Sequence, residues 1–145
     1  MADVTHVEIF DCTPEQFFDL VTDYESYSDF LSEVQSCKIL SQEADKKIVE
    51  YHVSVIKSFK YINEHQETRP TEVRWKFIKG DIFKSMAGHW KLSDQGGKTR
   101  AEYYAEASFG LLVPKIMTQK ALAVNLPAMM KAYHKRVAQL YKGEQ

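Results

Sequence analysis

The sequence predicts an α+β fold in which a curved antiparallel sheet surrounds one long C-terminal helix, with two short helices after the first strand. Two observations lead to this fold class. Apolar and polar residues alternate along successive short segments between residues 34 and 109, as in strands with one buried face. After Pro114 the apolar residues recur every three or four positions, as in a helix. The length of 145 residues suits a single domain over residues 1–145.

The N-terminal part begins with a strand and continues into two short helices. Val4–Phe10 is a strand candidate, and a helix-start signature follows it. Thr13 can cap the helix, Pro14 fits its first turn, and Gln16 completes a capping box. A second short helical segment is expected at Tyr24–Leu31. The first helix directs three apolar residues towards the core: Phe17, Leu20 and Val21.

Six further segments are expected to be strands. They are Val34–Ser41, Lys46–Ile56, Phe59–Arg69, Glu72–Gly80, Phe83–Asp94 and Thr99–Phe109. The links between them are short and turn-like, for example Ala44-Asp45 and Gln95-Gly96-Gly97. Because short links join neighbouring antiparallel strands, we expect a meander with one face towards solvent.

The C-terminal segment is expected to be a helix that starts after Pro114 and ends near Tyr141. Pro127 lies inside this segment and cannot donate a hydrogen bond to the carbonyl of Ala123. Either the helix starts or bends there, or the kink shapes a cavity beneath it. A curved sheet around such a helix buries both apolar faces, which is the helix-grip architecture. The apolar stripe of the helix consists of Ile116, Ala123, Leu126, Met130, Tyr133, Val137 and Leu140.

Composition and motifs exclude several classes of protein. The net charge of −1 gives no bulk attraction to nucleic acid, so no DNA partner is expected. No run of 18 apolar residues and no signal peptide is present, so we expect a cytoplasmic protein, with peripheral membrane contact as an option. Cys12 and Cys37 match no zinc or redox spacing and are expected to be reduced. Without a metal-ligand, phosphate-binding or catalytic motif, we expect no metal, no cofactor and no enzymatic activity.

Charge is distributed unevenly along the chain. Residues 114–145 carry six Lys and Arg against one Glu, so their net charge is 6 − 1 = +5 and that of the remainder is −6. A basic helix on an acidic body can contact an anionic lipid surface or RNA phosphates. Alternatively, it is a solvated face whose cations stabilise the C-terminal end of the helix.

The eighteen aromatic residues must fill a core, line a pocket, or both. Ala101, Ala105 and Ala107 share one face of the last strand, where small residues either allow close packing against the helix or leave a cavity. Phe17, Tyr27 and Phe30 are expected to be fixed packing. The ligand-binding candidates are Tyr51, Val53, Tyr61, Asn63, His65, Trp75, Phe77, Met86, Trp90, Tyr103, Ala105, Phe109, Met117, Met130 and Tyr133.

Two of these candidates are polar. Asn63 and His65 have the same parity as Phe59 and Tyr61 on their strand and therefore point inwards if those rings do. A buried polar pair of this kind either satisfies itself or a water molecule, or holds the carbonyl or head group of a ligand.

Three segments resemble coenzyme Q-binding START-like proteins. They are Phe17–Leu31, where Ser28 stands at a position that is usually Pro in such proteins, Gly80–Leu92, and Ala132–Arg136 with Leu140 and Tyr141. The resemblance spans nearly the whole chain and places it in the polyketide cyclase/dehydrase and lipid transport family of the Bet v 1-like superfamily. It implies a helix-grip fold with a hydrophobic tunnel between sheet and helix. Such families include lipid and quinone chaperones, ribosome-association toxins and aromatase/cyclases.

Three functions follow as hypotheses. The first is non-enzymatic binding and transport of a hydrophobic ligand, a lipid or an isoprenoid quinone, which enters near the Phe109–Pro114 loop. The second is a ribosome-associating module that uses the basic helix. The third is an aromatase/cyclase-type enzyme, for which Asn63, His65 and Tyr103 are the plausible set of reactive residues.

Overall fold

The computed structural model describes residues 2–54, 57–111, 113 and 126–142. Seven antiparallel strands form one sheet in the order β1-β7-β6-β5-β4-β3-β2. The strands are β1 (Ala2–Phe10), β2 (Val34–Glu43), β3 (Lys46–Ser54), β4 (Ser58–Thr68), β5 (Glu72–Gly80), β6 (Phe83–Gln95) and β7 (Lys98–Phe109). The α-helix α1 (Pro14–Val21), the 3₁₀ helix η1 (Tyr24–Asp29), the α-helix α3 (Leu126–Val137) and the π-helical turn η3 (Ala138–Lys142) complete the fold. All seven predicted strands are confirmed, as is the α+β helix-grip class.

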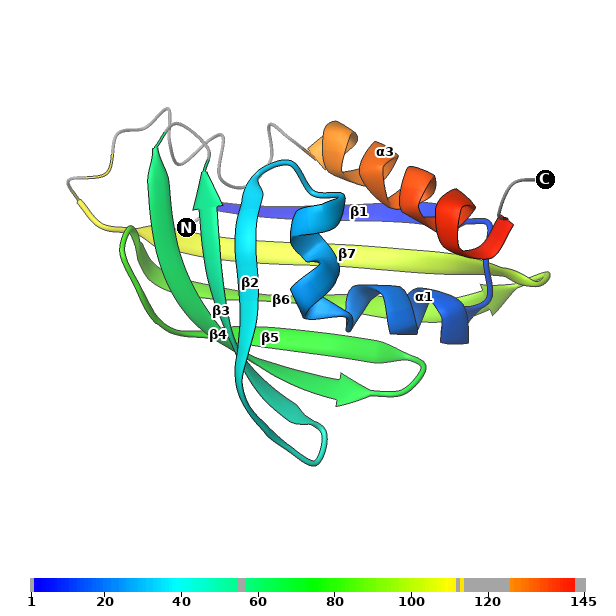
Figure 1. Cartoon of the computed structure of the whole chain (residues 1–145), viewed down its shortest axis with the longest axis horizontal. Coiled ribbons are helices and arrows are strands. Elements are labelled where there is room, and N and C mark those ends of the chain that lie inside the picture. The colour runs from blue at the N-terminus through cyan, green and yellow to red at the C-terminus, as the bar shows by residue number, and fades with distance from the viewer. Residues whose placement is uncertain (1, 55–56, 112, 114–125, 143–145) are drawn as a thin grey trace.

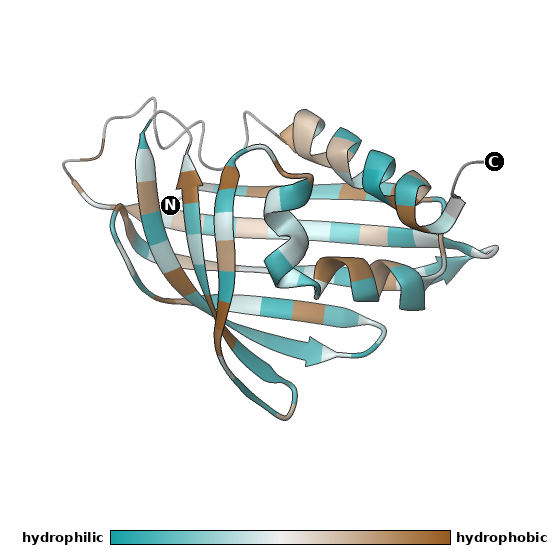
Figure 2. Cartoon of the chain, in the orientation of Figure 1, coloured by the Kyte–Doolittle hydropathy of each residue, from teal (hydrophilic) through white to brown (hydrophobic). Residues whose placement is uncertain are grey.

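The sheet is strongly curved, and the helices lie on its concave side (Figure 1). α1 packs against β6 and β7, η1 packs against β2, and α3 packs against β1. Consecutive strands pair with one another from β2 to β7, while β1 closes against β7 with Ala2 opposite Ala107 and Phe10 opposite Thr99. Figure 2 shows the apolar and polar residues alternating as bands along the strands, as the sequence pattern predicts.

The start of α1 forms as its capping residues predict. The Gln16 amide donates to the Thr13 hydroxyl at 3.2 Å, and the Gln16 side chain accepts from the Thr13 amide at 2.9 Å. Pro14 occupies the first helical position, where no intrahelical hydrogen bond is lost. The helix is thereby fixed with its apolar face on the sheet. The buried residues of this face are Phe17, Phe18, Leu20 and Val21.

Two groups of buried side chains form the core. The first, here the α1 cluster, joins α1 and α3 to β1, β6 and β7 and includes Phe10, Phe17 and Trp90. The second, here the η1 cluster, joins η1 to β2, β3 and β4 and includes Tyr27 and Phe59. The same sheet therefore supports two packed regions, one under each helical element.

The C-terminal helix confirms part of its predicted stripe. Met130, Tyr133 and Val137 are buried. Leu140 was expected on the same stripe but is exposed, because the helix continues from Val137 as a π-helical turn that changes the direction in which its side chains point. Tyr141 packs against the α1 cluster instead, and its hydroxyl donates to the Gln16 carbonyl at 2.8 Å.

The beginning of this helix cannot be compared with its prediction. Ile116, Met117 and Ala123, with Lys115 and Lys120 of the basic segment, lie outside the described residues. Pro127 is the second residue of α3 as described. Whether the helix starts or bends at Pro127, or a kink there shapes the cavity, depends on residues before Leu126 that the structure does not describe.

Candidate ligand-binding site

A cavity of about 310 Å³ lies between the concave face of the sheet, η1 and α3. Its walls are mainly aromatic and aliphatic side chains drawn from both core clusters. Binding pockets for small molecules start at about 300 Å³, so this cavity has the volume of a small ligand site. Eleven predicted residues line it: Tyr51, Val53, Tyr61, Asn63, His65, Trp75, Met86, Trp90, Tyr103, Ala105 and Tyr133.

Three predicted residues do not line the cavity, and a fourth, Met117, lies outside the described residues. Phe77 follows the last β5–β6 pair, Lys76 with Ala87, where the two strands separate. Phe77 and Phe109 lie behind Phe83, with ring centroids 6.2 and 5.0 Å from its own, so Phe83 is the ring that reaches the cavity.

The third is Met130, which is buried in the α1 cluster rather than in the cavity wall. Its neighbours on α3, Ala128, Met129 and Ala132, line the cavity instead. Tyr133, on the same predicted stripe, does line the cavity, so the cavity borders one edge of the stripe, and Met130, about 100° round the helix from Met129, points into the α1 cluster.

Other wall residues were assigned to packing or not singled out. Tyr27 and Phe30, expected to be fixed packing, both line the cavity because η1 and the residue that follows it form part of its wall. Phe59 shares the inward parity of Tyr61 on β4, and this signal could have identified it. The chain that leads from η1 into β2 contributes Leu31, Ser32, Glu33 and Val34, and no comparable pattern in the sequence marks them as wall residues.

The aromatic wall is held in place by ring contacts within and between strands. Tyr51 and Tyr61 stack across the β3–β4 pair with centroids 4.9 Å apart and planes 13° apart. Tyr103 lies 4.9 Å from Trp90 and 5.8 Å from Trp75, also by ring centroids. Gly88 stands directly opposite Trp75 in the β5–β6 register, and a side chain at this position would overlap the Trp75 indole. The glycine therefore provides the space in which Trp75 lies.

Asn63 and His65 form a polar pair on β4, each only 3% exposed. The Tyr51 hydroxyl lies 2.8 Å from Nε2 of His65, and the Asn63 amide nitrogen donates to the Met86 sulfur at 3.3 Å. Oδ1 of Asn63 and Nδ1 of His65 have no hydrogen-bond partner among the described residues. Buried polar atoms are seldom left unpaired in folded proteins, so these two atoms mark a place for a polar group.

His65 and the three tyrosines of the strands in this wall are uncharged at neutral pH. Burial, together with the nearby Lys47 cation, lowers the pKa of His65 to about 3. Burial raises the pKa of Tyr103 to about 12 and raises the pKa of Tyr51 and Tyr61 well above that of a free tyrosine. The polar pair therefore offers hydrogen bonds rather than charge.

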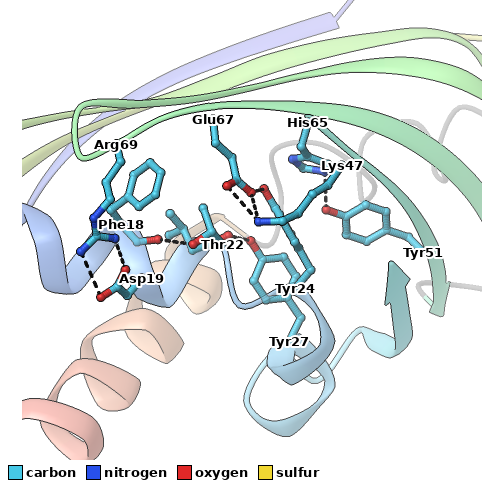
Figure 3. A network of polar contacts seen from close by, with 11 residues as sticks. Phe18, Asp19, Thr22, Tyr24, Tyr27, Lys47, Tyr51, His65, Glu67 and Arg69 are labelled. Carbon is cyan, nitrogen blue, oxygen red and sulfur yellow. Dashed lines mark hydrogen bonds and ion pairs between the residues drawn. The ribbon is translucent and has the colours of Figure 1, made fainter. Parts of the chain in front are cut away.

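An ion pair lies next to the polar pair, and the Tyr24 ring contacts both Lys47 and His65. Lys47 on β3 lies 2.7 Å from Glu67 on β4, and the Tyr24 hydroxyl donates to the same carboxylate at 2.8 Å (Figure 3). The Tyr24 ring packs against His65 with centroids 4.5 Å apart. The charges of Lys47 and Glu67 thus compensate each other beside the cavity.

The described residues contain neither a metal site nor a membrane span. Within 2–54, 57–111, 113 and 126–142, no group of three or more His, Cys, Asp or Glu side chains is arranged to hold a metal ion. No helix within those same ranges is long and apolar enough to cross a bilayer. Cys12 and Cys37 are both buried, and no disulfide joins them.

Solved structures share this fold. The START superfamily protein from Mycobacterium smegmatis superposes with a TM-score of 0.84 at 22% identity, over 95% of this chain and 98% of that one. The Zhui aromatase/cyclase from Streptomyces sp. R1128 gives 0.80 at 14% identity, over 98% of both chains. The STAR-related lipid transfer protein from Xanthomonas axonopodis gives 0.78 at 14% identity, over 94% of this chain and 86% of that one. At these identities the likeness concerns the fold.

Sequence comparison gives the family. A search of curated proteins finds no match. The family model described as "Polyketide cyclase / dehydrase and lipid transport" matches residues 11–133. This range includes α1, η1, all of β2–β7 and most of α3. The chain therefore belongs to the polyketide cyclase/dehydrase and lipid transport family.

Proposed function

We propose that this protein binds and carries a hydrophobic ligand, of the lipid or isoprenoid-quinone class, in the cavity between the sheet and α3. The observation that carries the proposal is the cavity of about 310 Å³, with its aromatic walls and its two unpaired polar atoms. Burying about ten methylene groups there would contribute roughly 8 kcal/mol before entropy losses, which suffices for useful affinity. The family description, which names lipid transport, agrees with this class of ligand.

We also propose that the ligand leaves chemically unchanged. A general base works best when its pKa lies near the operating pH, whereas burial lowers the pKa of His65 to about 3. His65 is therefore a weak proton acceptor at neutral pH. The Zhui aromatase/cyclase shares the fold, and conversion of a bound ligand would be the outcome that argues for an enzyme.

Organic extraction of the purified protein, followed by mass spectrometry before and after exposure to liposomes, tests the binding proposal. We expect an extracted lipid or quinone in about equimolar amount. Chemical modification of that ligand during incubation would contradict transport without catalysis. A protein that takes up no hydrophobic ligand under either condition would refute the proposal.

A pair of matched variants locates the binding. Ala132 lines the cavity from α3, whereas Ala138 is exposed in the following turn. Ala132→Leu places extra methyl groups in the cavity and is expected to reduce ligand uptake at least about fivefold, because overpacked sites lose roughly 1–3 kcal/mol. Ala138→Leu makes the same substitution at the surface and should bind ligand as the unmodified protein does. Equal uptake by the two variants would place the ligand elsewhere.

A further inference from the structure

The polar pair on β4 has a specific hydrogen-bonding character. The Asn63 amide nitrogen faces the Met86 sulfur, which can accept a hydrogen bond but has no proton to donate. This contact fixes the orientation of the amide, because the reversed orientation would place an oxygen against the sulfur. The unpaired atom of Asn63 is consequently its carbonyl oxygen, Oδ1, which can only accept a hydrogen bond.

His65 supplies the complementary group. Its ring is neutral, since burial lowers the pKa to about 3, so one nitrogen carries a proton and the other does not. Tyr51 and Nε2 of His65 lie 2.8 Å apart, and because a tyrosine hydroxyl is a stronger proton donor than a neutral imidazole N–H, we assign Tyr51 as the donor and Nε2 as the acceptor. The ring proton then lies on Nδ1, the atom without a partner. The pair thus presents one acceptor, on Asn63, and one donor, on His65.

We propose that the ligand of this site is a neutral apolar molecule with a hydroxyl group, which donates to Oδ1 of Asn63 and accepts from Nδ1 of His65. This inference rests on the binding function proposed above. A hydroxyl group can both donate and accept, whereas a carbonyl or ether oxygen only accepts and leaves Asn63 unpaired. A carboxylate would oppose the Asn63 oxygen and receives no net cation, because Lys47 is paired with Glu67. For a quinone-type ligand, the site therefore favours the reduced, hydroxyl-bearing form over the oxidised form.

Two probes of nearly equal shape test the proposal: 2-naphthol and 2-methoxynaphthalene, whose dissociation constants are measured by calorimetry with delipidated protein. We expect 2-naphthol to bind about 5- to 30-fold more tightly, since the ether cannot donate to Asn63 and an unsatisfied buried acceptor is unfavourable. Asn63→Leu should bring the two affinities to within about twofold, because it removes the acceptor and keeps the volume. Ala132→Leu should weaken both probes alike.

The outcomes separate this inference from the proposed function. If both probes bind the unmodified protein equally well, the hydroxyl preference is refuted, while ligand binding in the cavity stands. A preference for 2-naphthol that persists in both Asn63→Leu and His65→Phe also refutes it. If neither probe binds and no lipid is extracted, the proposed function fails together with the inference. Thermal unfolding of each variant confirms that it is folded before binding is interpreted.

Discussion

The α1 cluster and the η1 cluster use the same kind of side chain to different effect. In the α1 cluster, Phe10 and Phe17 are fully buried, stack with centroids 4.4 Å apart and contact Trp90 edge-on. In the η1 cluster, most of the rings are tyrosines whose hydroxyls need partners, as the contacts of Tyr24 and Tyr51 show. Rings without polar atoms can fill a volume from all sides, whereas tyrosines bring polar atoms into the interior.

The cavity lies between these two clusters. Its walls take Trp90 and Tyr133 from the α1 cluster, and Tyr51 and Phe59 from the η1 cluster. The α1 cluster therefore supplies the rigid support, and the η1 cluster supplies the wall that carries the polar pair. Substitutions in the α1 cluster should therefore change mainly stability, and substitutions in the η1 cluster should change mainly ligand binding.

The largest expected effect is the difference in stability between removing a ring from the α1 cluster and removing one from the cavity wall. Phe17→Ala should lower the free energy of unfolding by about 3–5 kcal/mol, because it leaves a cavity in close-packed surroundings. Phe59→Ala removes a ring that already borders the open volume, so we expect a smaller loss of about 2–3 kcal/mol. Urea unfolding of both variants measures the difference. If Phe59→Ala is as destabilising as Phe17→Ala, the two regions are packed alike.

Gly88→Ala should have the next largest effect. The added methyl group would overlap the Trp75 indole and the Tyr104 carbonyl, so either the ring or the strand must move. We expect a loss of about 1–3 kcal/mol in unfolding free energy, as for other overpacked sites, together with altered tryptophan fluorescence. Lys91→Ala, an exposed substitution on the same strand, is the control and should stay within about 0.5 kcal/mol. Unchanged stability and fluorescence in Gly88→Ala would show that Trp75 does not rely on the glycine.

The polar pair makes stability depend on pH. The pKa of His65 falls from 6.5 in the unfolded chain to about 3 in the folded protein, so the unfolded state binds the extra proton. The stabilisation is complete above pH 6.5 and is lost as the pH falls from 6.5 towards 3, by up to about 1.4 kcal/mol per pH unit. When the pH falls from 6.5 to 5, the free energy of unfolding of His65→Phe should therefore decrease by about 1–2 kcal/mol less than that of the unmodified protein. Urea unfolding at both pH values measures this difference. His52→Phe, on the outer face of β3, should retain the dependence; identical slopes in all three proteins would exclude His65 as its source.

Much of this architecture follows from local sequence patterns. The alternation along β3, β4 and β7 predicted which residues face inwards, and with them Tyr51, Asn63, His65 and Tyr103. A strand has only two faces, so the parity of one confidently placed residue fixes that of its neighbours. This is why the polar pair could be found without a structure.

The remaining differences depend on tertiary contacts. Met129 lines the cavity and Met130 does not, which could not be predicted because a sequence stripe does not define which edge of a helix borders a cavity. Phe30 lines the cavity only because η1 is positioned over it by Tyr27, whose hydroxyl donates to the Val21 carbonyl. That hydrogen bond joins two short helices whose mutual orientation no local pattern specifies. Phe77 was excluded by the separation of β5 from β6, which is likewise a property of the whole sheet.

The smallest expected effect concerns the rim beyond β7. Leu111 is 99% exposed, while the residue before it is held in place because the Gly110 amide donates to the Ile82 carbonyl at 3.0 Å. An anchored loop with an exposed leucine can insert that side chain into a bilayer when a ligand is transferred, since burying a leucine contributes about 1.5–3 kcal/mol. Leu111→Glu should slow transfer between vesicles about three- to tenfold and leave the melting temperature unchanged. Leu40→Glu makes the same change at another exposed leucine, on β2, and should transfer ligand normally. Equal transfer rates for both variants would mean that the cavity is loaded without membrane contact at this loop.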